Sequence, residues 1–113
     1  AGDGWEAAAR RLLDEAWRIV RPGGTVVVIE TLGTGRAEPA APDPVLARWY
    51  AWLEDRQGFA STWVRTDYRF ASPGEADRLA GAFFGARFAY QPGPAGSAIL
   101  PECTGLWWRR SEA

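Results

Sequence analysis

The feature that most constrains this fold is the junction between an amphipathic segment and an apolar run. Residues 3–20 carry apolar side chains at spacings of three and four, which predicts a helix. Arg21-Pro22-Gly23-Gly24 interrupts that pattern, and the run Thr-Val-Val-Val-Ile-Glu-Thr follows at once over 25–31. A strand that is apolar without alternation is typical of a parallel sheet covered on both faces. The junction therefore predicts an α/β fold in which residues 25–31 form a central strand.

Capping signals place the helices. Asp3 is expected to cap the first helix, and Asp43 to cap a second one over 43–58. Ser72 and Gly85 bracket a third helix, which has proline in its first turn. Residues 62–70 alternate in polarity, which predicts extended chain with one packed face and one polar face.

The C-terminal part of the chain predicts a closing hairpin. Short strands are expected over 87–90 and 104–109, with a Pro/Gly turn between them, and strands joined in this way pair antiparallel. Pro101 and Gly105 are poorly suited to the middle of a sheet ladder.

Composition limits the class of protein. The chain has 113 residues, enough for one domain, with 13 basic and 14 acidic residues, no histidine and no methionine. The near-neutral charge argues against a nucleic-acid or membrane-surface partner. One cysteine, Cys103, favours a reducing compartment such as the cytoplasm, and without histidine neither a metal site nor a cysteine nucleophile is expected. No run is long enough to span a membrane. The lack of methionine suggests a piece of a longer protein.

The order of these elements resembles the C-terminal half of class I S-adenosylmethionine-dependent methyltransferases. In that family a fourth helix ends in a turn like Arg21-Pro22-Gly23-Gly24 and leads into the fifth strand, here 25–31. Residues 72–85 match the fifth helix, and residues 87–90 with 104–109 match the final hairpin, whose seventh strand lies antiparallel between the fifth and sixth. The resemblance implies a partial Rossmann-like sheet with helices on its faces and a closing antiparallel β-hairpin.

The resemblance also implies what is missing. The family holds S-adenosylmethionine on a glycine-rich loop after its first strand, an acid ending its second strand, and residues near its fourth strand. None of these matches this chain, so residues 1–113 are expected to be the C-terminal portion of a methyltransferase domain that is inactive by itself. Residues 36–70 would be a variable insertion on the substrate side. A weaker alternative makes Gly33-Thr34-Gly35 the cofactor loop, although no helix begins directly after it.

Candidate substrate-binding residues lie where the strands are expected to end. Glu30 and Thr31 close the apolar strand, and ligands of open parallel sheets sit at such ends. Glu102 begins the antiparallel last strand and so reaches the same edge. A solvated strand end, and a capping role for Glu102, are the plainer interpretations.

A second group of candidates lies in the alternating segment. Trp63 and Tyr68 could stack on an acceptor, Asp67 could act as a base, and Arg65 could hold a carboxylate or phosphate. Surface ion pairs of Arg65 with Asp67, and a packed Trp63, explain the same pattern equally well. No catalytic residue is assigned.

The functional prediction is methyl transfer from S-adenosylmethionine to a small-molecule acceptor in the longer parent protein. A non-catalytic α/β binding or dimerisation module is the alternative, and a nicotinamide-dependent Rossmann enzyme is a third, weaker one. An incomplete sheet would leave the edge of the 25–31 strand exposed, which predicts self-association.

Overall fold

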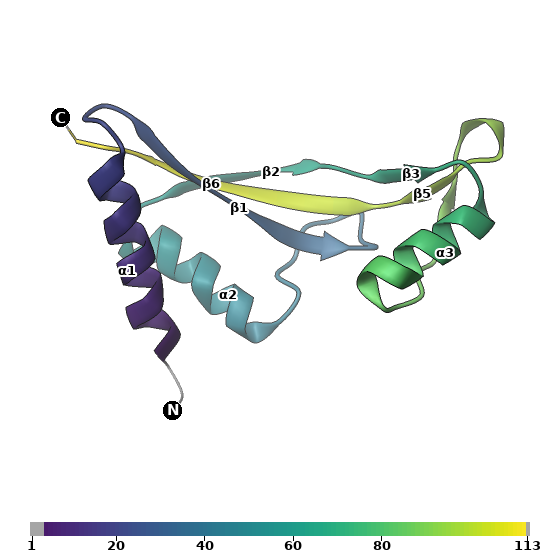
Figure 1. Ribbon diagram of the computed structural model, residues 1–113, viewed down its shortest axis with the longest axis horizontal. Helices are drawn as coiled ribbons and strands as arrows, with labels where there is room; N and C mark the ends of the chain where they lie inside the picture. The colour runs from purple at the N-terminus through teal and green to yellow at the C-terminus, as the bar shows by residue number, and fades with distance from the viewer. Residues whose placement is uncertain (1–3, 113) are drawn as a thin grey trace.

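A long strand near the C-terminus organises the structure. The computed structural model describes residues 4–112. In it, β5 (Ala98–Leu100) and β6 (Glu102–Arg110) follow each other through Pro101 and run along the long axis of the molecule (Figure 1). Each is the middle strand of a three-stranded antiparallel sheet. The fold is therefore mixed α/β with two small antiparallel sheets, and it is elongated, with extents of 51 × 36 × 22 Å.

The first sheet has the order β1-β6-β2. β1 (Thr25–Thr34) and β2 (Ala60–Arg65) both pair antiparallel with β6, so they run in the same direction on either side of it. The predicted strand over 25–31 is confirmed, but it is an edge strand rather than a central one. Residues 4–112 do not form the predicted parallel sheet, because the strand next to β1 is antiparallel.

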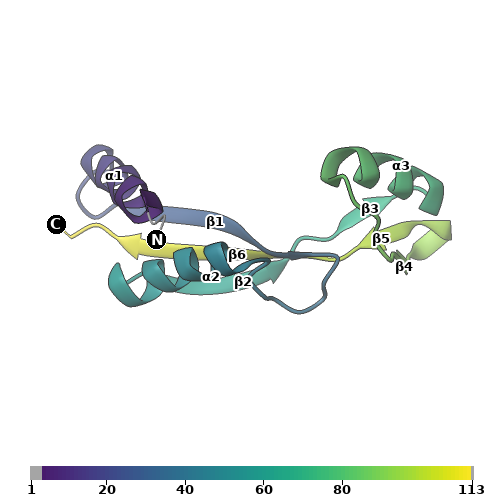
Figure 2. The ribbon, with the colours of Figure 1, turned by 90° about the horizontal axis from the view of Figure 1, so that it is seen from below.

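Three helices pack on one side of the strands (Figures 1 and 2). They are α1 (Gly4–Ile19), α2 (Pro44–Ala51) and α3 (Pro73–Phe84). The expectation of helices on both faces is wrong for the first sheet: Val26 and Val28 of β1 pack on the helices, whereas Val27 and Ile29 are 51% and 65% exposed.

The capping predictions hold where the structure describes them. Asp43 accepts a hydrogen bond from the backbone N–H of Leu46, and Ser72 accepts one from that of Glu75. Gly85 ends α3 in the left-handed conformation, with φ of 68°. Asp3, the expected cap of α1, lies outside the described residues. The second helix does not run to residue 58 in regular form, because a π-helical turn, η1 (Trp52–Arg56), replaces its last part.

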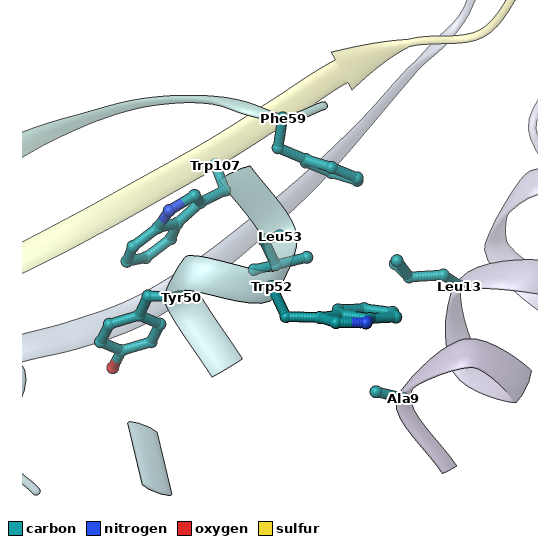
Figure 3. Packing of buried hydrophobic residues seen from close by; sticks show 7 residues of the cluster. All are labelled: Ala9, Leu13, Tyr50, Trp52, Leu53, Phe59 and Trp107. Carbon is teal, nitrogen blue, oxygen red and sulfur yellow. The ribbon is translucent and has the colours of Figure 1, made fainter. Parts of the chain in front are cut away.

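The hydrophobic core lies between the first sheet and the helices α1 and α2. Trp52 and Leu53 are consecutive residues of the π-helical turn, and both are buried in this core. Trp107 of β6 stacks on Tyr50 with 4.4 Å between ring centroids, and its Nε1 donates to Glu54. Figure 3 shows the cluster, whose buried members are Ala9, Leu13, Tyr50, Trp52, Leu53, Phe59 and Trp107.

The second sheet has the order β3-β5-β4 and packs beside α3. It consists of β3 (Tyr68–Phe70), β5 and β4 (Gln91–Pro92), with a short 3₁₀ turn, η2 (Pro94–Gly96), between β4 and β5. The predicted strand over 87–90 is wrong. Side chains hold that segment instead: Phe88 packs edge-on against Phe84, and the Tyr90 hydroxyl donates to the backbone carbonyl of Ala76.

The closing hairpin therefore has a different partner from the predicted one. β6, which covers the strand expected over 104–109, pairs with β1 and β2, while β4 pairs with β5. The segment 62–70 is extended as expected, in β2 and β3, but every residue of β2 is exposed and neither of its faces is closely packed.

Gly105 lies in the middle of the first sheet, contrary to the expectation from its residue type. It pairs with Glu30 on one side and Trp63 on the other. A Cβ atom there would lie 2.5 Å from the Trp107 ring and 2.8 Å from the side chain of Leu32. The absence of a side chain lets the Trp107 indole fold flat over the strand.

We predict that Gly105→Ala lowers the free energy of unfolding by about 1–3 kcal/mol, because it overpacks the indole against its own strand. Gly81→Ala is the control, since a Cβ in that helical position meets no atom within 4 Å. It should stabilise the protein by up to about 1 kcal/mol through helix propensity. Urea denaturation followed by tryptophan fluorescence measures both, and equal effects would contradict this packing.

Candidate functional site

Four of the predicted substrate-binding residues meet at one end of the first sheet. At this end β1 and β2 finish and β6 begins, and the strands surround an open depression of about 510 Å³. Glu30, Thr31, Tyr68 and Glu102 line it. The remaining lining residues are Ile29, Thr66 and Thr104.

Glu102 is the most unusual group in the depression. Its side chain is only 5% exposed, although it carries a carboxyl group. Its Oε2 accepts a hydrogen bond from the Thr31 hydroxyl at 3.0 Å, whereas its Oε1 is buried without a partner. Buried polar atoms nearly always have a partner, and a buried carboxyl oxygen without one is energetically costly.

A β-bulge sets the position of Thr31. The pairing of β1 with β6 shifts between Thr31 and Thr34, and Gly33 adopts φ of +124° within the irregular stretch. The backbone N–H of Gly33 donates to the Thr31 hydroxyl, which leaves the hydroxyl proton free to bond Glu102. Bulges commonly redirect a side chain beside a functional site in this way.

Aromatic residues of α2 support the β1 side of the depression. Glu30 accepts a hydrogen bond from Trp49 Nε1 at 2.8 Å, and the Tyr50 hydroxyl donates to the backbone carbonyl of Thr31. Burial, together with the nearby charges of Glu30 and Asp43, raises the pKa of Tyr50 to about 12. Tyr50 is therefore a neutral hydrogen-bond donor at neutral pH.

Arg65 and Asp67 form a bidentate ion pair, with both hydrogen bonds at 2.8 Å. Asp67 also accepts from the backbone N–H of Glu102, and its bond to Arg65 is the main cause that lowers the Asp67 pKa. These two residues consequently support Glu102 from behind and do not line the depression. Trp63 is 42% exposed on β2 and does not line it either.

The sequence-based assignment missed two threonines in the depression. The hydroxyls of Thr66 and Thr104 form a hydrogen bond that joins the end of β2 to β6. The alternation of residues 62–70 put Thr66 on the same side as Tyr68, and this pattern could have identified Thr66 as a lining residue. The register against β6, which brings Thr104 alongside, is set by tertiary packing.

Cys103 lies next to Glu102 and is fully buried. Its thiol donates to the backbone carbonyl of Arg36, and burial raises its pKa. A buried thiol with a raised pKa is a poor nucleophile, so its position suits a packing residue.

The glycines that follow the apolar strand do not form a cofactor cradle. A Cβ at Gly33 would lie 2.9 Å from Arg36, and one at Gly35 would lie 2.9 Å from the Phe88 ring, so side chains already fill both sites. The next helix begins only at Pro44, and its cap is the acidic Asp43. An anion-binding loop needs open backbone N–H groups at a helix N-terminus, and this loop lacks them.

Comparison of the sequence with protein-family models, with curated proteins and with solved structures finds no match in any of the three. The structure adds one general finding: no helix within residues 4–112 has the length and apolar character needed to cross a membrane.

We predict that the free energy of unfolding falls as the pH rises from 10 to 12, because folded Tyr50 keeps its proton to about pH 12 whereas an ordinary tyrosine loses it near 10. Tyr50→Phe removes this contribution, so its stability should fall less steeply over the same range. Urea denaturation at a series of pH values measures the slope. An equal slope in both proteins would show that Tyr50 is not the buried donor described here.

Proposed function

We propose that this chain is part of a class I S-adenosylmethionine-dependent methyltransferase domain that acts on a small molecule. The main support is the order β1-β6-β2, in which an antiparallel strand lies between two strands of common direction. The resemblance implies this arrangement for the fifth, seventh and sixth strands. The turn Arg21-Pro22-Gly23-Gly24 leads directly into β1, as the resemblance also implies.

The correspondence of elements differs from the one suggested by sequence. β2 takes the place of the sixth strand, which was expected over 87–90. The helix before it is then α2 with η1, rather than residues 72–85. Under this assignment, α3 and the second sheet form an addition between the sixth and seventh strands, and residues 36–70 contribute two sheet strands as well as the substrate side.

The described residues do not fit S-adenosylmethionine. The Arg36 side chain fills the space beside Gly33, near the end of β1, and the Phe88 ring fills that beside Gly35; the next helix begins with the acidic cap Asp43. We therefore assign the cofactor site to other parts of the parent domain. The free outer edge of β1 is where a further strand of that domain would pair. The proposed location is the cytoplasm, since the single cysteine is free and buried.

Under this proposal, the role of this chain is to bind the methyl acceptor. Methyl transfer depends mainly on bringing two reactants together in the right orientation. The depression lies where β1 and β2 end, and its hydrogen-bonding groups come from three strands or their ends: Thr31 from β1, Glu102 and Thr104 from β6, and Thr66 after β2. A site built on paired strands is rigid enough to fix an acceptor.

We predict that residues 1–113 alone bind no S-adenosylmethionine in a calorimetric titration, and that the full reading frame containing them does. This difference in binding is expected because the Arg36 and Phe88 side chains occupy the space beside Gly33 and Gly35, where a cofactor would have to approach the backbone. Binding by the short chain would contradict the assignment of the cofactor site. Absence of binding by the full protein would contradict the methyltransferase proposal itself.

A second candidate function, a self-associating module, is favoured by the uncovered side of the first sheet. Neighbouring positions in the strand register form an apolar surface there, called the open face, whose members are Val27, Ile29, Val64, Leu106 and Trp108. Ile29 is 65% and Trp108 39% exposed. Contiguous exposed apolar surface beside an unpaired strand edge is typical of an association site.

We predict that the chain sediments with a weight-average mass that rises with concentration, and that Ile29→Lys removes this rise. A lysine on the open face places an unpaired charge in the interface at little cost to the folded monomer. Leu12→Lys is the matched control, because Leu12 is similarly exposed, at 64%, but lies on α1. A monomer at all concentrations would contradict this candidate.

A further inference from the structure

The depression at the end of the first sheet has an electrostatic character that identifies the class of its ligand. The carboxyl group of Glu102 lines it, and no basic residue does. The Glu30 carboxyl group points to the other face of β1, where Trp49 donates to it. The nearest arginine of β2, Arg65, is held by Asp67 in a bidentate pair. Within residues 4–112 the ion pairs are Arg65–Asp67 and Arg18–Glu15, so Glu102 is not paired with a cation.

The buried Glu102 oxygen is the second, independent observation. Oε1 lacks any hydrogen-bond partner, whereas the other polar groups around it are bonded: Oε2 to Thr31, and Thr66 to Thr104. The terminal torsion of a glutamate is broad, so a small rotation of the carboxyl group brings an unpartnered oxygen toward the depression. A ligand that donates a hydrogen bond gives Oε1 the partner it lacks.

We propose that the depression binds a small amine, whose protonated nitrogen donates to Glu102. A charged N–H donor forms the stronger, charge-assisted type of hydrogen bond and supplies the positive charge that Glu102 lacks. An anionic ligand would add a further negative charge beside Glu102. A neutral ligand without an N–H or O–H group would leave Oε1 without a partner.

The remaining walls fit the carbon part of such a ligand. Tyr68, whose ring also packs edge-on against Phe84, and Ile29 both line the depression and are 41% and 65% exposed. An aromatic face also attracts a cation directly. The depression is within the size range of small-molecule sites. Residues 4–112 contain no cluster of three metal-ligating side chains, which favours an organic cation over a metal ion.

This inference concerns binding and holds whether or not the chain belongs to a methyltransferase. If the proposed function is also correct, the methyl acceptor is the amine nitrogen: the ammonium would give its proton to Glu102, the freed lone pair would take the methyl group, and the sulfonium would leave as a neutral thioether. The identity of the acceptor atom therefore rests on the proposed function, whereas the amine site does not.

The test uses three probes of similar shape: phenethylamine, 2-phenylethanol and phenylacetate. They carry a cation, a neutral hydroxyl and an anion on comparable frames. In ¹H–¹⁵N correlation spectra of the chain, phenethylamine should give saturable shifts at residues 29–31, 66–68 and 102–104. 2-Phenylethanol should bind about tenfold or more weakly, which corresponds to the loss of one charge-assisted bond, and phenylacetate should not bind.

Two variants of equal charge change complete the test. Glu102→Gln keeps the shape and an acceptor for Thr31, and it should weaken phenethylamine binding about tenfold. Glu38→Gln, in the exposed loop after β1, should leave the binding unchanged. The inference is overturned if phenethylamine does not bind, if the three probes bind equally, if the shifts lie elsewhere, or if Glu102→Gln binds like the unaltered chain. Because this readout needs no S-adenosylmethionine, it separates failure of the amine site from failure of the methyltransferase proposal.

Discussion

The pairing of β6 with strands on both of its sides is the interaction on which the rest of this structure depends. β1 and β2 do not contact each other in a ladder, and only β6 joins them into a sheet. The same strand carries Trp107, against which Tyr50 stacks, and so anchors α2 and the core. Its continuation through Pro101 into β5 forms the middle of the second sheet. Loss of the two ladders that β6 forms would separate the molecule into pieces too small to bury a core.

The candidate site is a direct consequence of that arrangement. Because β6 runs against both of its neighbours, its first residues lie where β1 and β2 end. Glu102 is thereby placed beside Thr31, and Thr104 beside Thr66. The bulge in β1 turns the Thr31 hydroxyl toward Glu102, and the Arg65–Asp67 pair holds the Glu102 backbone from behind. The proposed amine site and the proposed acceptor position thus share one geometric cause.

Local signals in the sequence predicted much of this, and long-range pairing accounts for what they missed. Asp43, Ser72 and Gly85 were read correctly because a cap depends on the few residues beside it. The unalternating run over 25–31 suggested a strand covered on both faces, yet β1 lies at an edge. Strand partners are set by packing between distant segments, so residues 87–90 were wrongly paired with β6. Gly105 was expected to be unsuited to a sheet, but the Trp107 ring occupies the space that a side chain would need there. The grouping of Glu30, Thr31 and Glu102 was predicted because the edge at which a strand ends follows from its direction alone. The unpartnered oxygen of Glu102 depends on tertiary packing, which the sequence pattern does not reveal.

The measurement that tests this account most directly is a search for cross-strand nuclear Overhauser effects from Gly105. The register places Gly105 opposite Glu30 on one side and opposite Trp63 on the other. Antiparallel pairs bring backbone protons of facing residues close together, so contacts from Gly105 to both residues are predicted. Contacts from β6 to residues 87–90 in place of either neighbour would contradict the β1-β6-β2 order, and with it the geometry of the Glu102 site and the main support for the proposed function.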